Sequence, residues 1–315
     1  MINHILDDIY QLKVPMPFSM GEVNCYLFKG ENGYTIVDTG DNTDEVKEIW
    51  EQIIPHISPI EKIVITHAHP DHLGLARWFK ENYDVPVWMS EKSYEQLQKT
   101  RALFKNGKYY NPQAEISVLH GGPKMKPEKE GYYKLSYFEF DPDVLFTEDQ
   151  DIPLGDIMYK PIWTPGHSVD HFCFYCSATE VFLVGDHLLS SINTIIISEY
   201  LEQNSLKDYL NSIKKIEDIS AKYILPGHGE LIDNLKQRIE KMRSHYDKKM
   251  KLILSSIDEK GNSAYEIAKI VYSDRFGSLS AMPAFFQIIT NLIYLESLGH
   301  IQMSKHDDIM VFKRA

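Results

Sequence analysis

The first third of the chain alternates short apolar runs with amphipathic stretches. Residues 9–15, 23–30 and 33–40 are rich in β-branched and aromatic side chains, which is typical of strands. Residues 42–57 begin with Asn and Thr, which favour a helix N-terminus, and then place apolar residues at helical spacing. The alternation continues with strands expected at 61–66 and 85–90 and helices at 72–83 and 91–104. This βαβα order predicts an α/β fold with a partly parallel sheet covered by helices.

Residues 102–150 interrupt this pattern with a stretch rich in Gly, Pro, Lys and Tyr. Long connections of this kind are binding loops or lids in some proteins and plain surface insertions in others, and the sequence leaves both open. A second alternation then follows, with strands expected within 157–168, 171–176, 181–189 and 221–229 and a helix at 205–218.

From residue 230 onward the pattern changes to helices followed by a short pair of strands. Helices are expected at 230–258, 263–272 and 281–299, and two strands joined by a polar turn at 300–314. This order has the outline of a winged-helix module. The sequence therefore predicts a larger domain over residues 1–230 and a small helical, winged-helix-like domain over residues 231–315.

Composition places the chain among ordinary soluble proteins. Of its 315 residues, 43% are hydrophobic and 25% charged, which is enough apolar material for a substantial core. No apolar run reaches the roughly 18 residues of a membrane span, and the N-terminus does not resemble a signal peptide, so we expect no membrane association. The three cysteines do not form a disulfide framework, which favours a reducing cytoplasm. Cys173 and Cys176 stand three apart on an expected strand and face opposite sides, so both are expected to be core residues.

The net charge of −12 argues against nucleic-acid binding by the surface as a whole. Residues 234–251 are the exception, because seven Lys and Arg outnumber Glu240 and Asp247 there, giving +5 and leaving −17 on the rest of the chain. Such a run is most often a solvated helix face. The helix expected at 281–299 offers Gln287 and Asn291 but no cation to a DNA groove. Its apolar residues are expected to pack against the main domain or a second subunit, so a homodimer is possible.

Three histidines and an aspartate crowd into six positions of the segment "THAHPDHLG". His67, His69, Asp71 and His72 follow an apolar strand-like run and precede a helical pattern. Solvated loops usually draw on Gly, Asn, Ser and Lys rather than on a row of metal-ligand side chains. The segment therefore indicates a metal site at a strand-to-helix junction.

Three further motifs each place a potential ligand at the end of an expected strand: "TPGHS" carries His167, "GDHLL" carries Asp186 and "PGHG" carries His228. Each of these residues follows a glycine, which suits a sharp exit from a strand. Because sites in α/β folds assemble at the carboxyl ends of strands, five histidines and two aspartates suffice for two metal ions. His187 is expected to point away on its strand. Five other histidines are expected to be ordinary surface residues: His4, His56, His120, His300 and His306.

Together with "VDTG" at residues 37–40, these motifs resemble the metallo-β-lactamase superfamily in their order, over roughly residues 8–230. The resemblance implies an αββα sandwich with the site along one edge of two packed sheets. It also implies the ligand sets: His67, His69 and His167 for one ion, Asp71, His72 and His228 for a second, Asp186 bridging both, and Asp38 supporting a ligand from behind.

Neutral imidazoles and carboxylates suit Zn²⁺, although Mn or Fe would also accept such ligands. Two ions about 3.5–4 Å apart hold a bridging hydroxide and make it a nucleophile near neutral pH. Asp71 could also orient the hydroxide and pass a proton to the leaving group.

The sequence differs from two branches of the family at a ligand position, and these differences reduce the range of activities to be expected. Asp186 stands where the antibiotic-hydrolysing enzymes have a cysteine ligand, and His69 where the di-iron oxygen reductases have a glutamate. "TPGHSVDH", "GDHLLSSI" and the helical tail resemble the beta-lactamase-like-protein-2 group. The leading hypothesis is a dinuclear-zinc hydrolase of a small-molecule thioester, lactone or ester, with Tyr109, Tyr110 and Tyr133 walling an apolar pocket near Phe138 and Phe140. The alternatives are an endoribonuclease or phosphodiesterase and, less favoured, a DNA-binding module with a vestigial metal site.

Overall fold

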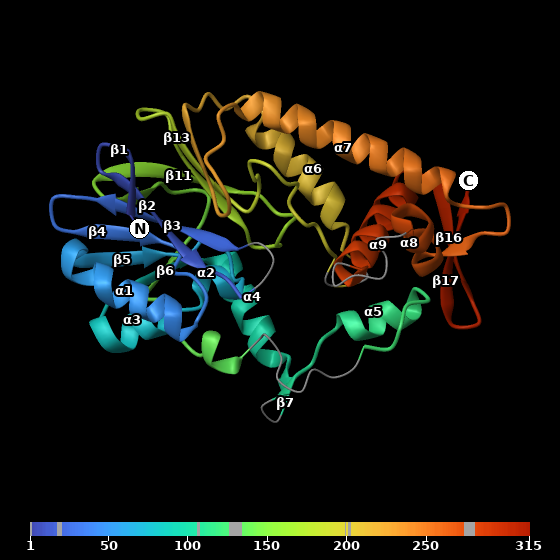
Figure 1. Ribbon diagram of the computed structural model, residues 1–315, viewed down its shortest axis with the longest axis horizontal. Coiled ribbons are helices and arrows are strands. Elements are labelled where there is room, and N and C mark those ends of the chain that lie inside the picture. The colour runs from blue at the N-terminus through green and yellow to red at the C-terminus, as the bar shows by residue number, and fades with distance from the viewer. Residues whose placement is uncertain are drawn as a thin grey trace. The chain divides into compact units, whose positions relative to one another are not determined.

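The computed structural model describes residues 2–17, 21–105, 108–125, 134–198, 200, 203–273 and 281–315 (Figure 1). By internal contacts the chain divides into two compact units. The first unit comprises residues 1–110, 131–194 and 218–235, and the second unit comprises 111–130, 195–217 and 236–315. The domain boundary at residue 230 expected from the sequence stays a prediction.

A seven-stranded mixed sheet forms one half of the first unit. Its order is β1-β2-β3-β4-β5-β6-β9, antiparallel from β1 to β4 and parallel from β4 to β9. The strands are β1 Ile2–Leu6, β2 Ile9–Pro15, β3 Glu22–Lys29, β4 Tyr34–Val37, β5 Ile60–Val64, β6 Val87–Ser90 and β9 Val144–Phe146. Parallel neighbours need crossover connections, which are supplied by α1 Asp44–Ile57, α3 Ala76–Tyr83 and α4 Glu91–Ala102.

A five-stranded sheet of order β10-β11-β12-β13-β14 forms the other half. Its strands are β10 Ile152–Leu154, β11 Ile157–Trp163, β12 Phe172–Cys176, β13 Val181–Gly185 and β14 Tyr223–Pro226. Only β13 and β14 pair in parallel. Cys173 and Cys176 are both buried and reduced, as expected, and Cys176 faces the core between the sheets.

Both faces of the first sheet are buried, which explains its nearly continuous apolar strands. Alternate residues face opposite sides. Val37 and Val64 join the core shared with Phe172 and Phe174 of the second sheet, whereas Ile36 and Ile63 face the helices. Helices α1 and α3 lie together beside this sheet (Figure 1). Between them, Trp50 of α1 packs edge-on against Phe79 of α3 at 5.1 Å between ring centroids.

One expectation about the first unit was wrong. The helix expected at 72–83 is interrupted: α2 covers Pro70–Leu73 and α3 starts again at Ala76. Within 102–150 the structure has short elements, β7 Phe104–Lys105, β8 Lys108–Tyr109 and the 3₁₀ turn Leu135–Tyr137. Phe138 and Phe140 are buried in the helix-side core, and their expected place beside a substrate pocket stays a prediction.

The second unit is built around α9, which supplies more of its buried core than any other single helix or strand. Phe285, Ile288, Ile289 and Leu292 are buried in the core of this unit, and the expected packing against the main domain or a second subunit stays a prediction. The elements are α5 Gln113–Leu119, α6 Ser205–Ile216, α7 Leu235–Ser255, β15 Asn262–Ser263, α8 Ala264–Tyr272, α9 Ala281–Ser297, β16 Ile301–His306 and β17 Ile309–Arg314.

Three strands, in the order β15-β17-β16, close the second unit. The expected strand pair is present, and the identity of the unit as a winged helix stays a prediction. His120 was wrongly expected at the surface: its ring is buried, stacks on Phe312, and places Nδ1 2.9 Å from the carbonyl oxygen of Ile116. None of the helices that the structure describes combines the length and apolar character needed to cross a bilayer.

Gly74 permits the interruption between α2 and α3. A Cβ at this position would lie 2.7 Å from the backbone nitrogen of Asn42 and 2.8 Å from the carbonyl oxygen of Gly40. Backbone cannot move aside as a flexible side chain can. We expect Gly74→Ala to lower the free energy of unfolding by about 1–3 kcal/mol or more, as overpacking does, in urea denaturation.

Gly30 offers the matched control, because a Cβ there would mainly meet the mobile carboxylate of Asp156. Gly30→Ala should cost less than about 1 kcal/mol. Equal losses for the two alanine substitutions would contradict this explanation of the break.

Candidate metal centre

The potential ligands all lie at the carboxyl ends of strands in the first unit. Each of the four strands that lead to them ends just before the motif that the sequence singled out or on its first residue. His67 and His69 follow β5, Asp71 and His72 lie in α2, and His167, Asp186 and His228 follow β11, β13 and β14. The first sheet therefore contributes four of the seven side chains and the second sheet contributes three.

The first group consists of His67, His69 and His167. Nε2 of His67 lies 2.9 Å from Nδ1 of His69, which lies 3.1 Å from Nε2 of His167. One nitrogen from each ring falls within 4.8 Å of the others, a spacing that could hold one ion. Burial, and after it the neighbouring His167, lower the pKa of His69 to about 3. The His69 ring is therefore neutral and can offer a nitrogen lone pair to a metal ion.

The second group consists of Asp71, His72 and His228. Oδ2 of Asp71 lies 3.6 Å from Nε2 of His72 and 3.3 Å from Nε2 of His228. Burial alone would raise the pKa of Asp71, because it disfavours the charged carboxylate. The neighbouring His72 and His228 have the larger effect and lower this pKa to about 2. These three side chains also converge closely enough to hold an ion.

Asp186 lies between the two groups. Its Oδ2 is 3.4 Å from Nε2 of His167, 3.5 Å from Nε2 of His72 and 3.3 Å from Nε2 of His228. Asp186 can thus reach both groups at once. Burial opposes a charge on His228, but Asp186 and Asp71 outweigh it and raise its pKa to about 10. Protons on the histidines are one way to balance the carboxylates, and a divalent cation is the other.

Hydrogen bonds behind the rings fix which nitrogen faces the cluster. Oδ2 of Asp38 accepts from the Thr66 hydroxyl at 2.8 Å and from Nδ1 of His72 at 2.7 Å. The Thr66 hydroxyl then accepts from Nδ1 of His67 at 2.9 Å. Nδ1 of His228 donates to the carbonyl oxygen of Glu22 at 2.8 Å. With their Nδ1 atoms occupied in this way, the three rings turn Nε2 toward the cluster.

The residues present fit a metal ion. Nε2 of His72, Nε2 of His228 and Oδ1 of Asp186 are buried and have no hydrogen-bond partner within the described part of the chain. Buried polar atoms without partners are costly, and a cation would satisfy these three. Space is equally restricted: a Cβ on Gly227 would overlap Oδ1 of Asp186 and come within 3.1 Å of the His72 ring. Glycine is therefore needed at position 227 because a side chain would not fit beside Asp186 and His72. The sequence had suggested a different reason, a sharp exit from the strand.

A seam of hydrogen bonds joins the two sheets next to the centre. The backbone N–H of Asn24 donates to the carbonyl oxygen of Gly227 at 2.7 Å. The Asn24 side chain donates to Pro226 and Gly229, each at 2.9 Å, and the Tyr26 hydroxyl donates to Pro226 at 2.8 Å. Strand β3 thus holds the loop that carries His228.

Two residues that the sequence left without a role support the centre. The buried Asp170 carboxylate accepts from the backbone N–H of Ala68 at 2.8 Å, and so fixes the peptide between His67 and His69. Nε2 of the buried His171 accepts from the backbone N–H of Asp186 at 3.1 Å, while its Nδ1 contacts the Thr164 hydroxyl at 2.8 Å. Both residues belong to the segment "TPGHSVDH", so the sequence did single out the stretch that contains them, but not their roles.

Other residues singled out by the sequence lie apart from these groups. Asp186 and His187 follow the end of β13, so strand alternation does not set their directions. The buried His187 ring lies 6.1 Å from that of His171. Tyr109 packs against Phe104, and Tyr110 is 38% exposed. Tyr133 is outside the described residues, and the substrate-pocket role of these tyrosines stays a prediction.

Two packed sheets with a histidine and aspartate cluster along their edge define a class of metal-dependent hydrolases. The chain belongs to the metallo-β-lactamase superfamily, whose family model matches residues 19–228. The αββα fold expected from the sequence is thereby confirmed, as is the resemblance to the beta-lactamase-like-protein-2 group.

Relatives cover most of the chain at low identity. The "Probable metallo-hydrolase YqjP" of Bacillus subtilis is 24% identical over 96% of this chain and 93% of its own length. The "Beta-lactamase-like protein 2 homolog" of Caenorhabditis elegans is 25% identical over 82% of this chain and 74% of its own. The "Atrochrysone carboxyl ACP thioesterase" of Aspergillus fumigatus is 22% identical over 72% of this chain and 56% of its own. A crystal structure of a β-lactamase domain protein from Burkholderia ambifaria matches with a TM-score of 0.88 and 26% identity over all of this chain and 93% of that chain.

His171 allows a test of how the centre is held. His171→Leu removes the acceptor for the Asp186 N–H, which should weaken zinc binding about 10–100-fold, the usual effect of losing a partner behind a ligand. His171→Gln can place an oxygen near the former Nε2 position and should restore most of the affinity. Competition against a chelator measures both. Equal zinc affinity in wild type and His171→Leu would refute the positioning role.

Proposed function

We propose that the protein is a dinuclear-zinc hydrolase of small ester-type bonds. The observation that carries the proposal is the convergence of five imidazoles and two carboxylates, with Nε2 of three rings held toward one another by hydrogen bonds behind them. His67, His69 and His167 would hold one ion, Asp71, His72 and His228 the other, and Asp186 both. Bound zinc would supply an activated water and a Lewis acid for the substrate carbonyl.

The protein's own residues complete the mechanism. Asp38 and Thr66 orient His72 and His67, and Asp170 and His171 fix the backbone that carries the neighbouring ligands. Asp71 is less enclosed than Asp186, with a side chain 12% exposed against 5%. It is therefore the carboxylate best placed to pass a proton to a leaving group.

The ester-type bond is supported by the donor set and by one relative. Asp186 supplies a hard oxygen donor, where a β-lactam-hydrolysing site of this family would use a cysteine. A relative named as an acyl-carrier-protein thioesterase shares 22% identity over most of this chain. The substrate class that we infer is accordingly a thioester, with simple esters and lactones as chemical equivalents.

The competing activity is cleavage of RNA, for which two metals are equally suited. Its support is the basic segment 234–251, most of which forms α7. The structure weakens that support: Arg238 is buried, Arg243 pairs with Glu217, and Lys249 donates to Gln287 at 3.0 Å. Three exposed lysines of α7 outside any described pocket remain for phosphate contacts: Lys236, Lys241 and Lys251.

Metal content tests the site. Protein purified without chelator should contain about two zinc ions per chain by elemental analysis, as expected of a dinuclear centre. Asp186→Asn keeps the volume but removes the charge near both groups, so zinc content should fall to about one ion or less. His187→Gln, its neighbour, should retain both ions. Folded, active wild-type protein with less than one ion would contradict the mechanism.

A substrate panel tests the chemistry. Zinc-loaded protein should turn over thioester, ester or lactone substrates faster than a β-lactam or an RNA oligonucleotide, by initial rates. Lys236→Glu, Lys241→Glu and Lys251→Glu combined should leave thioester turnover within a few-fold and insensitive to salt. If RNA is the substrate, affinity should instead fall with salt with a log–log slope of about −0.7 per phosphate contact, and the triple variant should flatten it.

A further inference from the structure

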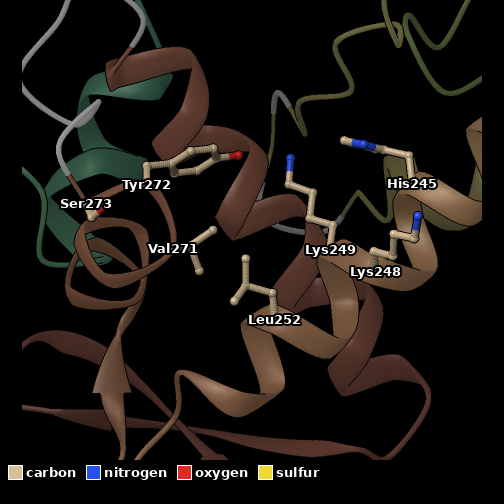
Figure 2. Close-up of a pocket in the computed structure, with 7 residues that line it drawn as sticks. All are labelled: His245, Lys248, Lys249, Leu252, Val271, Tyr272 and Ser273. Atoms are coloured by element: carbon tan, nitrogen blue, oxygen red, sulfur yellow. The ribbon is translucent and has the colours of Figure 1, made fainter.

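A pocket of about 480 Å³ lies within the second unit (Figure 2), whereas all seven candidate metal ligands belong to the first unit. Helix α7 contributes one wall and the C-terminal end of α8 the other. The lining residues are His245, Lys248, Lys249, Leu252, Val271, Tyr272 and Ser273. A volume of this size is in the range of small-molecule sites.

The polar groups of this pocket are hydrogen-bond donors or potential cations. Figure 2 shows the Lys249 amine, the His245 ring and the Tyr272 hydroxyl directed toward the same space. None of the seven lining residues carries a carboxylate. Among the described residues, moreover, no ion pair is formed by Lys248 or Lys249. In a chain of net charge −12, this is a local concentration of positive charge.

Lys249 is the most constrained of these groups. Its amine donates to Gln287 on α9 at 3.0 Å and lies 5.7 Å from the centre of the Tyr272 ring. Burial lowers the pKa of Lys249 to about 8, because neither contact compensates a full charge. Burial raises the pKa of Tyr272 to about 12, so its hydroxyl stays protonated and can donate.

We infer that this pocket binds a small organic dianion of the phosphate-monoester type. The phosphate would lie beside the Lys249 amine, where charge-assisted hydrogen bonds are strongest, with the His245 ring and the Tyr272 hydroxyl as further donors. The apolar part of the ligand would lie against Leu252 and Val271. This site is separate from the proposed hydrolase centre and does not depend on it.

Calorimetry on the full-length, zinc-loaded protein tests the inference, with phenyl phosphate as the probe. Phenyl phosphate should bind saturably in the millimolar range or tighter, and phenol, which lacks the phosphate, should not. Lys249→Met should weaken binding about tenfold or more, as loss of a charge-assisted hydrogen bond does. Tyr272→Phe, which keeps the ring, should weaken it several-fold.

Lys241→Met is the matched control, because Lys241 is an exposed lysine of the same helix that does not line the pocket. It should bind phenyl phosphate within about twofold of wild type. An isotope-labelled lysine signal from Lys249 should also show its pKa rising when phenyl phosphate is added, which phosphate bound at the zinc centre would not cause.

Three outcomes would overturn the inference. The first is no saturable binding, and the second is an unchanged affinity in both Lys249→Met and Tyr272→Phe. The third is binding of a single-stranded RNA oligonucleotide, but not of phenyl phosphate, that is lost in Lys249→Met. That result would mean that the pocket binds nucleic acid and not a phosphate monoester. Thermal unfolding of each variant shows whether a loss of binding reflects a loss of fold.

Discussion

Two carboxylates, Asp71 and Asp186, are buried beside each other, and the rest of the centre is arranged around this constraint. Both carboxylates lie 3.3 Å from the same atom, Nε2 of His228, and like charges so near each other repel strongly where water is excluded. Each carboxylate therefore lies within 3.6 Å of imidazole nitrogens, and three buried polar atoms are left for a cation to satisfy. Without a cation the histidines must carry the balancing protons, which is why the pKa of His228 is raised and that of Asp71 lowered.

Much of the fold could be predicted from the sequence, because strands buried on both faces read as apolar runs and the helices carry clear caps. Thr43, for example, accepts from the backbone of Val46 at the start of α1, as the sequence indicates. The seven candidate ligands could also be picked out, since each stands where an apolar run ends at a polar motif, and the structure brings them together in groups that could hold a metal ion. The interruption at Gly74 could not, because it depends on contacts with a loop more than thirty residues earlier.

The supporting residues were harder to find for a different reason. Asp170 and His171 act on backbone N–H groups, and such contacts leave no periodic pattern in a sequence. Residue type was also a poor guide to exposure at His120, which is polar but buried. Counting charges overstated the basic surface of α7, because burial and pairing remove some of its cations.

The seam between Asn24, Tyr26 and the loop after β14 also bears on how the protein is made. Residues joined by these bonds are separated by about two hundred positions in the chain. On a ribosome, the first sheet emerges with His67, His69, Asp71 and His72 long before His228 exists. The group of His67, His69 and His167 must wait for the first strands of the second sheet, β10 and β11, and the group of Asp71, His72 and His228 for its last strand, β14. The full set of seven candidate ligands can therefore come together only late in the synthesis of the chain.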